Sequence, residues 1–194
     1  MAANLQETPR RYYSLEEYFA IEKVGEARYE YWDGEIVCMS GGSEQHTILS
    51  GNVFGELREK LRGGKCWPYN EGMAILTPSL PPYRYPDVSA VCGERNLQSL
   101  QGIKVLLNPT LIVEVLSPTT EHADRDEKKS AYQALPSLRV YLLVSQTAHH
   151  ITRFSRHGEF WHREEFSGLD AVIPLPSLNC DLALRDIYEG VIFE

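Results

Sequence analysis

Apolar residues recur along the chain at two spacings, one typical of helices and the other of strands. Over residues 48–61 they return every three or four positions, which predicts a helix with a single apolar face. Ser14 and Glu17 form the pattern of a capping box and predict a second helix that ends near residue 23. Two further helices are expected over residues 120–135 and 182–188, the latter capped by Asp181.

Two segments, residues 111–116 and 138–145, are apolar almost without interruption and predict strands buried on both faces of a sheet. An N-terminal β-hairpin is predicted to turn at Asp33 and Gly34, and a C-terminal β-hairpin around residues 156–158. Further strands are expected over residues 65–69, 73–77, 86–92 and 172–175, with a loop over residues 93–108.

The alternation of helices and strands predicts an α/β fold, in which a mixed β-sheet core is flanked by helices. The strand at 111–116, the helix after it and the strand at 138–145 have the order of a right-handed crossover unit. Because no break in composition is visible, we expect one domain over residues 1–194, with residues 1–13 as a flexible N-terminal segment.

The composition is that of a folded, water-soluble protein, since 43% of the 194 residues are hydrophobic and 24% are charged. The formal net charge of −8 argues against a broad basic surface for nucleic acid or anionic membranes. It does not argue against a local site in which a bound cation supplies the positive charge. Neither a signal peptide nor a run long enough to span a bilayer is visible. We therefore expect a cytoplasmic protein without membrane contact, whose four scattered cysteines are buried thiols rather than a disulfide framework.

Glu114 interrupts the apolar segment 111–116. On either face of the predicted strand its carboxylate would be buried, and a buried ionised carboxylate needs a counter-charge or a metal ion. Asp87 poses the same question near the start of the strand at 86–92. These two residues are therefore the first candidates for chemistry.

The helix expected after Glu114 carries Asp124, Lys128 and Tyr132 at intervals of four residues, so that the three share one face. Two carboxylates and a lysine suit metal-assisted hydrolysis, because Mg²⁺ prefers carboxylate oxygens and a lysine can orient water or stabilise developing charge. A buried ion-pair cluster that only stabilises the core would show the same spacing, so the residues alone leave both interpretations open.

Several segments resemble one known family. Pro86-Asp87 followed by Glu114 resembles the PD-(D/E)XK nuclease pattern. More specifically, residues 29–46, residues 108–118 (NPTLIVEVLSP) and residues 124–144 are similar to the matching segments of the Uma-two-type endonucleases. The similarity extends from residue 14 to residue 188, nearly the whole chain.

The resemblance implies a restriction-endonuclease-like fold with a metal-dependent nuclease core. It implies Asp87 and Glu114 as ligands of Mg²⁺ or Mn²⁺, and Lys128 as the catalytic lysine. The position at which the pattern has its lysine is Leu116 here, which is a departure, and Lys129 competes with Lys128 for the role.

Two auxiliary residues are expected beside this set. His46 matches a histidine of the family near the start of the helix at 48–61, where it could contact a phosphate or water near the metal, or only pack on the helix. Tyr132 shares the helix face of Lys128. Glu30, in another matching segment, could face the site or pair with a lysine of the hairpin.

The resemblance therefore implies a Mg²⁺- or Mn²⁺-dependent endonuclease that hydrolyses phosphodiester bonds of nucleic acid, with DNA as the expected substrate. Two other functions fit the sequence. One is a catalytically silent interaction module that retains the nuclease fold, and the other is a hydrolase of a small phosphorylated substrate. By analogy of fold, we expect a homodimer.

Overall fold

The computed structural model of the protein describes residues 11–24, 28–32, 34–38, 42–79, 81–117 and 124–193. Four expectations concern parts outside the described residues: the flexible segment over residues 1–10, Asp33 in the N-terminal turn, the helix start over residues 120–123, and the side chain of Asp124. The chain divides into two compact units, Met1–Ser40 and Gly41–Glu194. The expectation of a single domain stays a prediction.

The described residues of the first unit form one helix and one hairpin. Helix α1 (Leu15–Val24) begins with the predicted capping box, in which Ser14 Oγ accepts from the Glu17 N–H over 3.2 Å and Glu17 Oε2 accepts from the Ser14 N–H over 2.8 Å. Strands β1 (Tyr29–Trp32) and β2 (Glu35–Cys38) pair antiparallel, which confirms the N-terminal hairpin.

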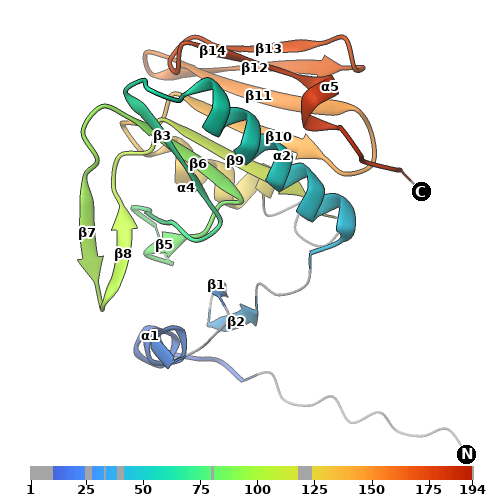
Figure 1. The fold of residues 1–194 in the computed structure, drawn as a ribbon. Helices are drawn as coiled ribbons and strands as arrows, with labels where there is room; N and C mark the ends of the chain where they lie inside the picture. The colour runs from blue at the N-terminus through green and yellow to red at the C-terminus, as the bar shows by residue number, and fades with distance from the viewer. Residues whose placement is uncertain are drawn as a thin grey trace, which may run out of the picture. The chain divides into compact units, whose positions relative to one another are not determined.

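The second unit is built on a six-stranded sheet in the order β12-β11-β10-β9-β6-β3 (Figure 1). The two central strands β9 and β10 run parallel, whereas the other neighbours pair antiparallel. The C-terminal hairpin is formed by β11 and β12, as predicted. The strands are β3 (Cys66–Asn70), β6 (Val88–Cys92), β9 (Leu111–Leu116), β10 (Val140–Ser145), β11 (His150–His157) and β12 (Phe160–Ser167).

Two smaller sheets adjoin it. A four-stranded sheet has the order β5-β4-β8-β7, and a two-stranded sheet joins β13 to β14. Their strands are β4 (Ala74–Leu76), β5 (Tyr83–Arg84), β7 (Leu97–Leu100), β8 (Ile103–Leu106), β13 (Val172–Leu175) and β14 (Cys180–Ala183).

The loop expected over residues 93–108 is wrong, because β7 and β8 form a hairpin there. Its two turn residues, Gln101 and Gly102, have φ angles of 51° and 92°. A two-residue hairpin turn needs such positive angles, and glutamine is not among the residue types that typically adopt them. The sequence therefore lacks the usual signal for a hairpin at this position.

Helices cover both faces of the large sheet (Figure 1). Helix α2 (Glu44–Lys60) lies across one face together with α5 (Leu184–Ile187), while the π-helical turn η1 (Asp124–Lys128) and α4 (Lys129–Gln133) lie on the other. The predicted cap of the last helix is wrong: Ala183 occupies the N-cap position, because Asp181 belongs to β14.

Strand β9 is buried along its whole length, as predicted. Leu111, Val113 and Val115 pack in the cluster that contains the α2 residues, and Ile112 and Leu116 pack in the cluster that contains Tyr132 of α4. Since neighbouring residues of a strand alternate between faces, Glu114 points to the α4 side of the sheet.

The cysteines differ from expectation. Cys66 and Cys92 are partners in the β3–β6 register and form a disulfide, which their separation of 26 residues did not indicate. Cys38 is exposed and Cys180 is half-buried, so neither is the buried thiol that was expected. In the part of the chain that the structure describes, the helices lack the length and hydrophobicity needed to cross a membrane.

Candidate functional site

The two candidate carboxylates lie at the same end of two adjacent central strands. Strands β6 and β9 pair antiparallel with Val88 opposite Val113, so the next position in this register places Asp87 beside Glu114. The exposed fraction is 9% for Asp87 and 3% for Glu114. Residues 27 positions apart in the sequence thus meet at one edge of the core.

The orientation of Asp87 is fixed from two sides. Its Oδ2 accepts a hydrogen bond from the Val115 N–H over 2.6 Å, and its Oδ1 lies 3.2 Å from His46 Nε2. His46 occupies the first turn of α2, where its own N–H donates to Ser43 Oγ over 3.1 Å. The structure therefore brings His46 to Asp87, as the predicted auxiliary role requires, although its role in catalysis stays a prediction.

Glu114 is contacted by the helical segment that follows it. The Tyr132 hydroxyl donates to Glu114 Oε1 over 3.1 Å, and Lys128 Nζ lies 3.7 Å from the same oxygen. Both partners are buried, with exposed fractions of 0% for Tyr132 and 4% for Lys128. The buried carboxylate thus has the counter-charge that its position demands.

The two competing lysines point to different places. Lys128 faces Glu114, whereas Lys129 Nζ lies 5.3 Å from the centroid of the Phe154 ring. Leu116, at the position where the family pattern has its lysine, packs in the apolar cluster of the α4 side. The geometry favours Lys128 as the ammonium of this site.

Gln146 is a site residue that the sequence analysis did not single out. It follows β10 directly, and its Nε2 donates to the Leu116 carbonyl oxygen over 2.6 Å. Its Oε1 accepts from Ser43 Oγ, the cap of α2. The carboxyl ends of parallel neighbours meet at one sheet edge, so a polar residue just after the second strand was the available signal.

Glu30 belongs to the first unit and is buried there. Its expected alternatives, facing the site or pairing with a lysine of the hairpin, stay predictions.

The residues present fit a divalent cation of the magnesium type. Mg²⁺ is commonly bound through one or two carboxylates, with water and substrate oxygens in its other positions. Among the described residues, no group of three or more His, Cys, Asp or Glu side chains is arranged to hold a metal ion. Asp87 and Glu114 match the number of carboxylates that such an ion takes from a protein.

Known proteins resemble this chain over most of its length. Residues 15–185 match the family model described as "Uma2: Putative restriction endonuclease". Two uncharacterized proteins of Synechocystis sp. are relatives. One is 34% identical over 194 residues, which is 100% of both chains, and the other is 28% identical over 158 residues, which is 81% of this chain and 89% of the relative.

A solved structure has a similar fold. It is described as "a putative nuclease belonging to DUF820" from Anabaena variabilis, with a TM-score of 0.68 and 16% sequence identity over 87% of this chain and 93% of that chain. At this identity the likeness concerns the fold alone, and it confirms a mixed α/β fold of the restriction-endonuclease-like type. Taken with the family match over most of its length, the chain belongs to the Uma2 family.

Proposed function

We propose that this protein is a Mg²⁺- or Mn²⁺-dependent endonuclease that hydrolyses phosphodiester bonds of DNA. Asp87 and Glu114 would hold the metal ion, and Lys128 would act on the reacting groups. The observation that carries the proposal is that the two carboxylates lie at the same end of β6 and β9, where Asp87 Oδ2 accepts from the Val115 N–H and Lys128 Nζ lies 3.7 Å from Glu114 Oε1. Membership of the Uma2 family supports it.

Hydrolysis forms a bond between a water oxygen and phosphorus and breaks one phosphorus–oxygen ester bond. A divalent ion held by Asp87 and Glu114 would polarise a phosphoryl oxygen and lower the pKa of water. The ammonium of Lys128 would hydrogen-bond the attacking water or stabilise negative charge that develops on the phosphate. Tyr132 and His46 act as positioning residues, because each contacts one of the two carboxylates.

The proposal includes a homodimer, since one site can cut only one strand and a symmetric pair presents a second site to the other strand. Sedimentation of the protein with and without duplex DNA measures this state directly. A monomer in both conditions would remove the dimer from the proposal and leave the hydrolytic site untouched.

Cleavage of supercoiled plasmid tests the function. The wild-type protein should nick DNA with Mg²⁺ or Mn²⁺ and not with chelator, and Asp87→Asn, Glu114→Gln and Lys128→Met should each lower the rate by about 10²-fold or more. Asp170→Asn is the matched control, because this carboxylate pairs with Arg185 on the surface. Equal rates in the site variants and in the control would refute the assignment.

A catalytically silent interaction module is the second candidate. It is favoured by the burial of Lys128 against Glu114, which can stabilise the core without any metal ion. Calorimetric titration with Mn²⁺ separates the two functions. A nuclease site binds the ion and loses it in Glu114→Gln, whereas a silent module gives no heat in either protein.

A further inference from the structure

The hairpin of β7 and β8, here called the arm (Leu97–Leu106), stands out from the body of the second unit (Figure 1). Its two strands are at the edge of the four-stranded sheet, and only the base of β8 pairs with β4, through Val105 and Leu106. We infer that the arm is a contact surface for duplex DNA and enters its major groove. This inference rests on the proposed function and adds to it where the substrate lies.

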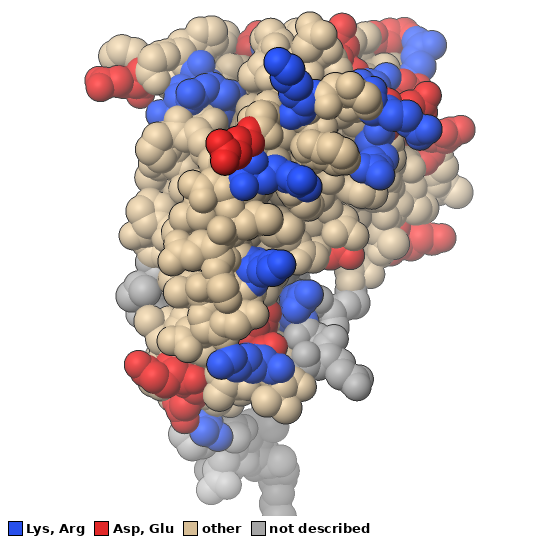
Figure 2. Space-filling view, turned by 60° about the vertical axis from the view of Figure 1, so that its left-hand side comes forward, with Lys and Arg blue, Asp and Glu red and all other residues tan. Residues whose placement is uncertain are grey.

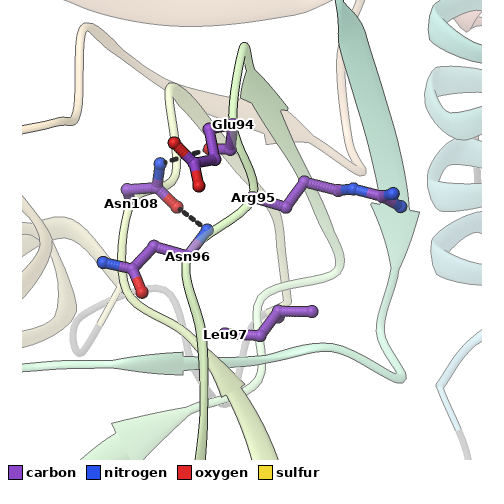
Figure 3. Close-up of a pocket in the computed structure, with 5 residues that line it drawn as sticks. All are labelled: Glu94, Arg95, Asn96, Leu97 and Asn108. Atoms are coloured by element: carbon purple, nitrogen blue, oxygen red, sulfur yellow. Dashed lines mark hydrogen bonds between the residues drawn. The ribbon is translucent and has the colours of Figure 1, made fainter.

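The arm has a regular hairpin conformation with hydrogen bonds at its root. Its turn residues Gln101 and Gly102 have the positive φ angles of a two-residue hairpin turn, which matches the twist of the flanking strands. At its root, Asn108 Oδ1 accepts from the Asn96 N–H over 2.9 Å, and Asn108 Nδ2 donates to the Glu94 carbonyl oxygen over 2.8 Å (Figure 3). A preformed arm loses little conformational entropy when it binds.

The chemistry of the arm fits base edges and phosphates. Gln98, Ser99, Gln101 and Lys104 are exposed, and the sequence of the arm contains no Asp or Glu, although the chain has 27 of them. The major groove of B-form DNA admits a two-stranded β-ribbon, and glutamine side chains can hydrogen-bond adenine there. A lysine beside them can neutralise a phosphate.

The root of the arm adds a cation that lies over an aromatic ring. The guanidinium of Arg95 lies 5.2 Å from the ring centroid of Trp67, whose exposed fraction is 44%. An open cavity of about 430 Å³ adjoins it, lined by Glu94, Arg95, Asn96, Leu97 and Asn108 (Figure 3).

The charge around the arm is also suitable. Figure 2 brings forward the side of the second unit that carries the arm, and Lys and Arg side chains are scattered over this side, with Asp and Glu side chains among and around them. The net charge of −8 belongs to the chain as a whole and not to this side alone. A duplex is attracted by the local potential of such a face, so a negative total does not exclude binding.

The arm lies within reach of a duplex held at the candidate site. Strand β5, which ends at Arg84 three residues before Asp87, is separated from β7 by β4 and β8. Three strand spacings of about 4.8 Å put the root of the arm about 14 Å from Arg84, and the three residues from Arg84 to Asp87 add at most about 10 Å. The sum of about 24 Å is about seven base pairs along a duplex. A-form RNA has a deep, narrow major groove that does not admit such a ribbon, so the arm selects DNA.

Fluorescence anisotropy of the full chain with a short duplex DNA, in chelator, tests the inference without cleavage. Lys104→Ala should weaken binding about three- to tenfold and lower the slope of log K against log salt by about 0.9. Gln98→Ala combined with Gln101→Gly, which keeps the turn, should reduce the difference in affinity between duplexes of different sequence. Lys60→Ala is the control, because this lysine pairs with Glu56 on α2, on the opposite side of the large sheet.

Unchanged affinity and salt slope in Lys104→Ala, or equal affinity for a duplex RNA of the same sequence, would overturn the arm as a DNA contact. Plasmid cleavage with Mg²⁺ is measured separately. Cleavage without any effect of the arm variants on binding refutes the arm alone. Weaker binding of the arm variants in a protein that never cuts supports the arm and refutes the nuclease proposal alone.

Discussion

Gln146, the first residue after β10, donates a hydrogen bond of 2.6 Å to the carbonyl oxygen of Leu116, the last residue of β9. The same side chain accepts from Ser43 Oγ, and Ser43 Oγ accepts from the His46 N–H. One amide thereby ties the carboxyl ends of two parallel strands to the helix turn that carries His46. We interpret Gln146 as a positioning residue of the candidate site.

Replacing Gln146 should therefore affect stability and activity. Gln146→Ala leaves the buried Leu116 carbonyl without this donor, and we expect the free energy of unfolding to fall by about 1–3 kcal/mol. Plasmid nicking should slow as well, because the turn that holds His46 against Asp87 is no longer tied to the sheet. Urea unfolding and nicking rates measure the two effects.

The variant Gln146→Glu separates the effect on stability from the effect on activity. This variant keeps the shape and an acceptor for Ser43 but cannot donate to Leu116 at neutral pH, so it should share the loss of stability. A nicking rate per folded molecule that equals the wild-type rate in both variants would restrict Gln146 to a structural role.

The effects of replacing Lys128 and Glu114 on the free energy of unfolding should be strongly coupled. Lys128→Met leaves Glu114 buried beside an apolar side chain, and we expect a loss of about 3–5 kcal/mol in unfolding free energy. The double variant Lys128→Met/Glu114→Gln removes both charges and should recover most of that loss. Urea unfolding of the four proteins gives the coupling energy. Additive single effects would show that the two side chains do not interact.

The main elements of the site could be predicted from the sequence because they lie in regular, strongly patterned segments. Glu114 is conspicuous in the apolar segment of β9, and Lys128 and Tyr132 follow it at helical spacing. The turn η1 is π-helical, yet both side chains still reach Glu114. The burial of a residue inside a continuous apolar segment depends on its neighbours in the sequence, so it can be predicted from the sequence alone.

Other features depend on which strands become neighbours. The bond between Gln146 and Leu116 needs the parallel register of β9 and β10, and the Cys66–Cys92 disulfide needs the pairing of β3 with β6. The arm needs a positive φ angle at Gln101, which no residue-type preference signals. Such relationships are set by tertiary structure and cannot be obtained from spacing alone.

Low pH should lower the stability of the second unit, because it protonates the carboxylate of Glu164. The side-chain hydrogen bond from Arg153 lowers the pKa of this carboxyl below its ordinary value of 4.5, against an opposing effect of burial. The folded pKa is thus below the unfolded one, so the unfolded chain binds the proton more readily in acid. The stabilisation is present above the unfolded pKa and is lost as the pH falls through the folded pKa.

Glu164→Gln tests this dependence. The wild-type protein should be more stable than the variant at neutral pH, and the difference should shrink as the pH is lowered below the ordinary glutamate pKa. Urea unfolding over a pH series measures it. Asp170→Asn serves as a surface control, and a wild-type advantage that persists unchanged in acid would contradict the prediction.

The Cys66–Cys92 disulfide should stabilise the pairing of β3 with β6, the strand that leads from Asp87. It closes a loop of 26 residues, for which the chain-entropy relation gives about 3–4 kcal/mol. Reductant should therefore lower the urea midpoint of the wild-type protein.

The double variant Cys66→Ser/Cys92→Ser should have the stability of the reduced protein, and its urea midpoint should not change with reductant. Cys180→Ser should keep the response, because Cys180 is a free thiol whose pKa is raised by burial. A wild-type midpoint that is the same in both redox conditions would show that the disulfide contributes nothing to stability.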